Sequence, residues 1–86
     1  MKIQVLGSGC ANCHKVEELA NKAVAQLGIS AQVELVTDMQ TIMRYGVMNT
    51  PGIVIDDKVV STGRVPALSQ MTQLITEAVA RQGTSR

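Results

Sequence analysis

Short runs of β-branched residues alternate with stretches of helical periodicity in this chain, and this alternation limits the folds open to it. Residues 2–6 alternate and carry Ile3 and Val5, which is typical of a strand. Residues 11–27 instead repeat apolar side chains at intervals of three and four, which predicts an amphipathic helix capped by Gly28. Because the chain has 86 residues, it has room for one domain with a modest core. The N-terminal part therefore predicts a strand followed by a helix.

The alternation continues to the C-terminal end. The remaining elements are a strand at 31–36, a short helix capped by Thr37-Asp38 and running through Tyr45, a hairpin of 53–55 and 58–60 around Asp56-Asp57, and a last helix that starts at Pro66. We expect the order β-α-β-α-β-β-α, an α/β fold with a four-stranded mixed sheet and three helices. Residues 1–82 would form the domain, and residues 83–86 a flexible tail.

Charge is balanced along the chain, which argues against several classes of partner. Eight Lys and Arg residues stand against seven Asp and Glu, for a formal net charge of +1, and no basic run stands out. Nucleic acid and anionic membrane surfaces are therefore not expected as partners. The N-terminus has a single Lys2 before a short strand-like run, without the long apolar stretch of a signal peptide or membrane span. We expect a soluble, cytoplasmic monomer.

Two cysteines, Cys10 and Cys13, are the only ones in the chain, and they follow the break that ends the first strand. In a reducing compartment such a pair is more often catalytic or metal-binding than a structural disulfide. A thiol reacts as its thiolate, and the unpaired amides and positive dipole end of a helix lower its pKa. Cys10 stands at that junction, while Cys13 lies one helical turn inward. This predicts Cys10 as the nucleophile and Cys13 as the resolving thiol.

Four neighbours of the cysteines are candidate modulators of the thiols. Ala11 and Asn12 separate the cysteines, and His14 and Lys15 follow them. The two basic side chains would add positive potential, each with a minor effect if it is solvated. For His14 alone, a solvated position in the first helical turn is the simpler interpretation.

With these motifs the chain resembles, over its whole length, the small thioredoxin-like proteins of glutaredoxin size described as redox-active disulfide proteins. The resemblance rests on Cys10-x-x-Cys13 after the first strand and on Thr50-Pro51 just before the third strand. The Asp56-Asp57 turn and Gly63 before the last helix support it.

The resemblance implies a minimal thioredoxin-like fold and a function as a thiol-disulfide oxidoreductase. Pro51 would be cis and packed beside the cysteine pair, with the Thr50 backbone hydrogen-bonding an extended substrate. Electrons would pass through the Cys10–Cys13 disulfide to protein disulfide substrates. A thiol reductase or a low-molecular-weight thiol would supply them, and no cofactor is expected beyond that disulfide.

Several positions depart from the thioredoxin pattern and limit what can be carried over. Thioredoxins have Trp before the first cysteine and Gly-Pro within the pair, where this chain has Gly9 and Ala11-Asn12. Their first strand carries a buried acid where this chain has Gln4, so proton transfer at Cys13 would need water or another group. Glutaredoxins hold glutathione with Gly-Gly before the last helix, whereas Thr62-Gly63-Arg64 stands here. Reduction potential and glutathione use therefore do not follow from the resemblance.

Covalent haem attachment is one alternative, because Cys10-x-x-Cys13-His14 is its literal signature. Attachment takes place on the oxidising side of a membrane, and small cytochromes are helical, so compartment and alternation both argue against it. Met39, Met43 and Met48 are possible axial ligands, but we expect Met39 and Met43 on the core face of the short helix.

Metal carriage is the stronger alternative, with Cys10 and Cys13 as thiolate ligands for copper or zinc. Gly9 to Cys13, followed by Val16-Glu17, looks like the metal loop of heavy-metal-associated domains. Those domains run β-α-β-β-α-β and have Met where this chain has Ser8. A non-catalytic thioredoxin-like interaction module is the third possibility.

Overall fold

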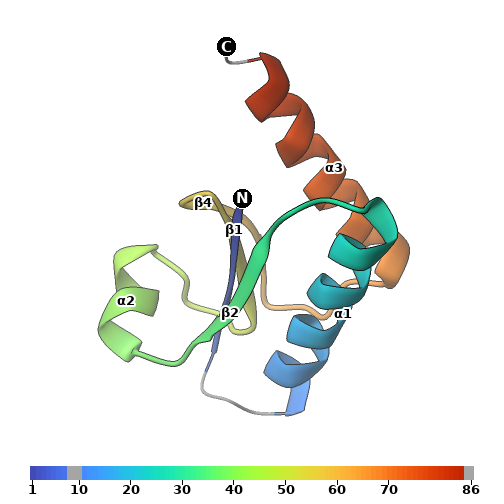
Figure 1. The fold of residues 1–86 in the computed structure, drawn as a ribbon. Coiled ribbons are helices and arrows are strands. Elements are labelled where there is room, and N and C mark those ends of the chain that lie inside the picture. The colour runs from blue at the N-terminus through green and yellow to red at the C-terminus, as the bar shows by residue number, and fades with distance from the viewer. Residues whose placement is uncertain (8–10, 85–86) are drawn as a thin grey trace.

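The helices and strands follow one another in the order that the alternation predicts. The computed structural model describes residues 1–7 and 11–84. Its elements are β1 (Lys2–Leu6), α1 (Ala11–Leu27), β2 (Gln32–Val36), α2 (Met39–Arg44), β3 (Gly52–Ile55), β4 (Lys58–Thr62) and α3 (Leu68–Thr84) (Figure 1). The β-α-β-α-β-β-α prediction is confirmed, and the β-α-β-β-α-β order of heavy-metal-associated domains is not found.

The four strands form one mixed sheet in the order β2-β1-β3-β4. Strand β1 is central: Ile3 is aligned with Val33 of the parallel strand β2 and with Ile55 of the antiparallel strand β3. The parallel pair follows from the crossover through α1, which returns the chain to the same end of the sheet. Strands β1 and β3 are therefore covered on both edges, and the outer strands are β2 and β4.

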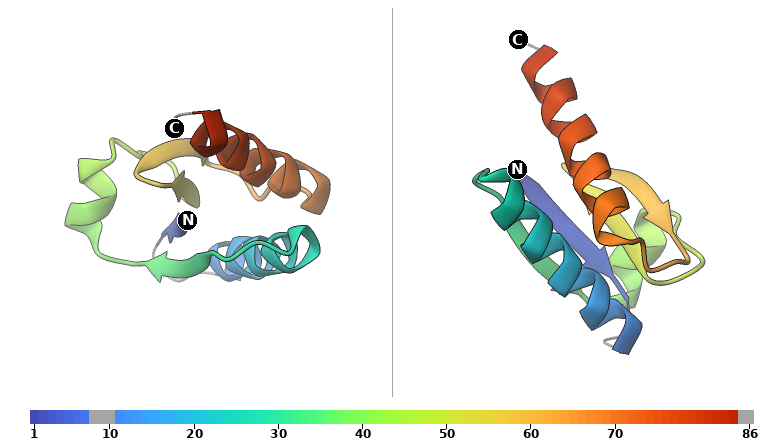
Figure 2. Two further views of the ribbon diagram at one scale, coloured as in Figure 1. Left: turned by 45° about the horizontal axis from the view of Figure 1, so that its top comes forward. Right: turned by 90° about the vertical axis from the view of Figure 1, so that its right-hand side faces the viewer.

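The two faces of the sheet carry different helices. Helices α1 and α3 lie together over one face, and α2 lies on the other side (Figure 2). Because side chains alternate along a strand, Ile3 and Val5 enter the core under α1 and α3, while Leu6 packs with Ile42 of α2. Residues that fill the larger core are Ile3, Val5, Val16, Ala20, Ala23, Ile53, Ile55, Met71, Ile75 and Ala78.

The β3–β4 hairpin closes through the expected two-residue turn. Asp56 and Asp57 both adopt positive φ, at 49° and 68°. A type I′ turn requires this conformation at both central residues, and Asp is among the residues that tolerate it. Further along, Ile53 is aligned with Ser61 and Val54 with Val59, so Val60 is an extra residue that forms a β-bulge.

Helix α3 differs at both ends from the sequence-based boundaries. It begins at Leu68, two residues after Pro66, and the Ala67 N–H donates to Gln70 Oε1 at 3.1 Å. This side-chain contact from the third helical residue back to the N-cap is half of a capping box, which explains the later start. The helix also continues through Thr84, so it includes the first two residues of the tail expected at 83–86. Among the residues described, no helix combines the length and apolarity needed to cross a membrane.

The expected core positions of Met39 and Met43 are wrong. Their side chains are 61% and 68% exposed, whereas Ile42 between them is only 3% exposed. Each residue turns the helix by roughly 100°, so burying Ile42 against Leu6 and Val54 turns the next residue, Met43, away from the sheet. Met39 is the first residue of α2, one turn before Met43.

Candidate functional site

Cys13 lies in the first turn of α1, fully buried against the end of β1. The neighbouring residue at that end is Gly7, which is also buried. A Cβ atom added to Gly7 would overlap the Cys13 Sγ and would lie 3.2 Å from the Cys13 Cβ. Only a residue without a side chain permits this approach of backbone and sulfur. The glycine that ends β1 is therefore what makes room for the Cys13 thiol.

Thr50 reaches the same place from the loop before β3. The Cβ position at Gly7 is 3.9 Å from the Thr50 Cβ. The Thr50–Pro51 peptide bond is cis, as the resemblance implies, with Pro51 buried and Thr50 exposed. The structure thus brings Cys13, Thr50 and Pro51 together around the end of β1.

The loop after β4 contacts the loop that contains Thr50 and Pro51 through Gly63. Gly63 has φ +74° and donates its backbone N–H to the Pro51 carbonyl at 2.9 Å. A Cβ on Gly63 would lie 3.0 Å from the Asn49 Cβ. Gly63 therefore combines a left-handed backbone with a close approach, both of which favour glycine.

Cys10, the predicted nucleophile, lies outside the described residues, as do Ser8 and Gly9. Its role and its disulfide with Cys13 stay predictions. The four candidate modulators are all exposed in the first turns of α1. His14 Nδ1 lies 3.5 Å from Glu17 Oε1, an (i, i+3) contact on the helix surface.

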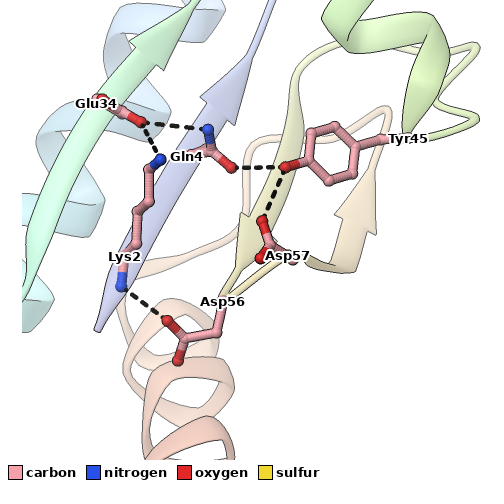
Figure 3. A network of polar contacts seen from close by, with 6 residues as sticks. All are labelled: Lys2, Gln4, Glu34, Tyr45, Asp56 and Asp57. Atoms are coloured by element: carbon pink, nitrogen blue, oxygen red, sulfur yellow. Dashed lines mark hydrogen bonds and ion pairs between the residues drawn. The ribbon is translucent and has the colours of Figure 1, made fainter.

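Gln4 occupies the position at which thioredoxins carry a buried acid, and a polar network fixes its side chain. Gln4 is 7% exposed; its amide nitrogen donates to Glu34 Oε1 at 3.2 Å, and its amide oxygen accepts from the Tyr45 hydroxyl at 3.0 Å (Figure 3). The same hydroxyl lies 3.2 Å from Asp57 Oδ1, so one phenolic proton is shared by two acceptors. Gln4 is thus hydrogen-bonded to Glu34 on β2 and to Tyr45 after α2, and Tyr45 in turn is hydrogen-bonded to the hairpin turn.

Gln4 also lies on the opposite side of the sheet from α1. Its strand neighbours Ile3 and Val5 pack with Val16 of α1, and alternation places Gln4 on the other face. The side chain of Gln4 therefore points away from α1, the helix that carries Cys13.

The environment of Tyr45 raises the pKa of its phenol above the ordinary 10.0. Desolvation is the largest cause, followed by the hydrogen bond to Asp57 and the negative charge of that carboxylate. The protonated phenol is the form that can donate to Gln4 and Asp57, so the raised pKa and the hydrogen bonds support one another.

Sequence reasoning missed Gly7 and the partners of Gln4. Gly7 was visible only as a strand breaker, and its contact with the Cys13 sulfur requires the fold. A glutamine inside an otherwise buried strand was a usable signal, because a buried amide needs hydrogen-bond partners.

No group of three or more His, Cys, Asp or Glu side chains is arranged to hold a metal ion within residues 1–7 and 11–84. The two-thiolate alternative depends on Cys10, so this finding does not test it.

Comparison with known proteins agrees with this architecture. The family model described as "Thioredoxin domain" matches residues 1–76. A thioredoxin of Methanothermobacter thermautotrophicus is 37% identical over 75 residues, which cover 87% of this chain and 97% of that protein. A thioredoxin of Methanocaldococcus jannaschii is 37% identical over 71 residues, covering 83% of this chain and 81% of that protein. The chain belongs to the thioredoxin-domain family.

Proposed function

We propose that this protein is a thiol-disulfide oxidoreductase that works through Cys10 and Cys13. The observation that carries the proposal is the convergence of Gly7, the buried Cys13 thiol and Thr50 at one end of the sheet, beside the cis Pro51. Membership in a family whose relatives are named thioredoxins supports the same chemistry.

The division of labour between the cysteines follows from burial and position. Cys13 is fully buried, so a disulfide arriving from solvent cannot reach it directly. Residue 10 directly precedes Ala11, the first residue of a 17-residue helix, where amide groups and the helix dipole favour a thiolate. Cys10 is therefore the attacking thiol, and Cys13 acts on a sulfur already bound to its neighbour.

The reaction takes two exchange steps. The Cys10 thiolate attacks one sulfur of the substrate disulfide, forming a mixed disulfide and expelling the other substrate sulfur as a thiolate. The Cys13 thiolate then attacks the Cys10 sulfur, which releases the second substrate sulfur and closes the Cys10–Cys13 bond. The substrate gains two electrons, and the protein loses two. A thiol reductase or a low-molecular-weight thiol in the cytoplasm would then reduce the Cys10–Cys13 disulfide again.

We assign the binding of an extended substrate to Thr50 and Pro51. Thr50 is exposed and close to Gly7, which itself contacts Cys13, while Pro51 is buried and lacks a backbone N–H. In this assignment the Thr50 backbone forms the hydrogen bonds to the substrate.

Trapping of the mixed disulfide tests this proposal. Cys13→Ser should accumulate a covalent adduct with a model disulfide protein such as insulin, detected on a non-reducing gel and reversed by dithiothreitol. Cys10→Ser, the matched control, should form none, and the wild-type protein should reduce insulin without accumulating adduct. Absence of adduct in Cys13→Ser, together with tight stoichiometric zinc or copper binding by the reduced wild-type protein, would instead support metal carriage.

A further inference from the structure

A polar hollow of about 440 Å³ lies between β4 and α3, on the side of the sheet that α3 covers. Ser61, Thr62 and Arg64 border it from β4 and the following loop, and Gln70, Gln73 and Glu77 border it from α3. Its volume is within the range of pockets that bind small molecules or short peptides.

The hollow lies beside the edge strand β4. Strand β4 is the last strand of the sheet and pairs with β3 alone among the described strands. Val60 and Ser61 both border the hollow because the bulge at Val60 interrupts the alternation of side chains. The outer backbone N–H and C=O groups of an edge strand point away from the sheet, so a segment paired with β4 would lie beside this hollow.

Charges are separated along this hollow. Arg64 lies in the loop that leads to the start of α3, whereas Glu77 is seven residues beyond Gln70 on the same helix face. At 1.5 Å per helical residue this interval is about 10 Å, the length of about three residues of extended chain. The hollow therefore has the length of a short strand, with a cation toward one end and a carboxylate toward the other.

The cationic end adjoins the candidate site. Arg64 directly follows Gly63, whose N–H donates to the Pro51 carbonyl at 2.9 Å. A segment lying along β4 would thus reach the loop that holds Thr50 and Pro51.

We propose that this hollow binds an extended peptide segment of a partner protein as an added strand on β4. The segment carries an acidic side chain opposite Arg64 and a basic side chain opposite Glu77. Main-chain hydrogen bonds to the edge would supply affinity, and the two charges would supply specificity. This docking site is separate from the cysteine chemistry and does not depend on it.

The outer edge of β2 offers a built-in comparison. Its Glu34 is half exposed and forms an ion pair with Lys2 at 3.4 Å. A hollow at the start of β2 is bordered by Lys2, Gln32 and Asp56 among others, and none of its lining residues belongs to α3. A peptide of the proposed kind should therefore distinguish β4 from β2.

Peptide titration of the full chain tests the proposal. The probes are two fluorescein-labelled, C-terminally amidated pentapeptides, Glu-Val-Thr-Val-Lys and its reversed sequence, because parallel and antiparallel addition place the charges in opposite orders. Binding is followed by fluorescence anisotropy, and backbone amide shifts are followed by NMR. At least one peptide should bind and shift the amides of residues 60–62 more than those of β2.

Variants and modified peptides make the test specific. Arg64→Gln and Glu77→Gln, both at exposed positions, should each weaken binding roughly two- to fivefold, as expected for solvent-exposed ion pairs. Lys22→Gln on exposed α1 is the matched control and should leave affinity unchanged. N-methylation of alternate peptide amides should abolish binding.

Three outcomes would overturn this proposal: neither peptide shifts residues 60–62 at millimolar concentration, Lys22→Gln weakens binding as much as Arg64→Gln, or the same shifts arise without peptide as the protein is concentrated. The last outcome would identify a second copy of the chain as the occupant. None of them affects insulin reduction, so failure here leaves the proposed oxidoreductase function standing.

Discussion

The backbone of Gly7 occupies the space directly beside the Cys13 sulfur, and any side chain at residue 7 would overlap that atom. The contact joins the end of β1 to the first turn of α1, the two elements on either side of the predicted nucleophile. The position of the Cys13 thiol is thus limited by a residue that carries no functional group.

Gly7→Ala should displace Cys13 and lower stability. Forcing a methyl group into this buried contact should cost about 1–3 kcal/mol, as overpacking does in other cores. Urea unfolding would measure the loss, and release of the mixed disulfide should slow because the Cys13 sulfur has moved. Gly28→Ala is the control for the release step: its Cβ has no neighbour within 4 Å, so it should cost stability only through its left-handed backbone, at φ +65°, and should leave release unchanged. A variant with wild-type stability and wild-type release would contradict the proposed close packing.

Tyr45 can be titrated directly because it is the only tyrosine and the chain has no tryptophan. Its raised pKa predicts a tyrosinate absorbance midpoint above 10.0 in the folded protein, shifting to the ordinary value in urea. The folded state therefore holds the phenolic proton more tightly than the unfolded state. The associated stability is fully present below pH 10 and is lost as the pH rises through the folded pKa. A folded-state midpoint at or below 10.0 would show that the Asp57 contact and desolvation do not act as described.

Removing the Tyr45 hydroxyl should destabilise the protein by way of Gln4. Tyr45→Phe leaves the buried Gln4 amide oxygen without its hydroxyl donor, at a cost of about 1 kcal/mol. Replacing both polar partners, in Gln4→Leu combined with Tyr45→Phe, should cost less than the sum of the single changes, because no buried polar atom is then left unpaired. Chemical unfolding of the four proteins in the cycle would measure the coupling. Strict additivity would indicate that the Gln4–Tyr45 hydrogen bond makes no net contribution.

The order of the elements was predictable because helix and strand periodicities differ and each break contains a strong turn signal. The Asp56-Asp57 turn is the clearest example, since its chemistry is local. Contacts between distant segments were not predictable in this way. Gln4 is bonded to residues 30 and 41 positions away, and nothing in the local pattern names Glu34 or Tyr45 as those partners.

Orientation of the short helix was the other limit. Apolar spacing placed the methionines of α2 toward the core, but a six-residue helix has too few positions to define its buried side from periodicity alone. The neighbouring sheet decides instead, and Ile42 fits between Leu6 and Val54. In the candidate site, by contrast, the Thr50–Pro51 pair was identified from resemblance, because a local motif carries that information.

Gly63 and Gly46 form a matched pair that separates backbone strain from loop positioning. Both have positive φ, at 74° and 72°, so alanine at either position should cost about 1–2 kcal/mol for the left-handed backbone. A Cβ at Gly46 meets nothing within 4 Å, whereas a Cβ at Gly63 would lie 3.0 Å from the Asn49 Cβ. Gly63→Ala should therefore displace Asn49, the residue that precedes Thr50, and it should strain the hydrogen bond that Gly63 donates to Pro51.

We expect Gly63→Ala to raise the KM for a disulfide substrate several-fold, while Gly46→Ala lowers stability without changing KM. Urea unfolding and insulin-reduction kinetics on both variants would provide the comparison. Equal KM values for the two variants would mean that Gly63 serves only the turn and does not position the substrate loop.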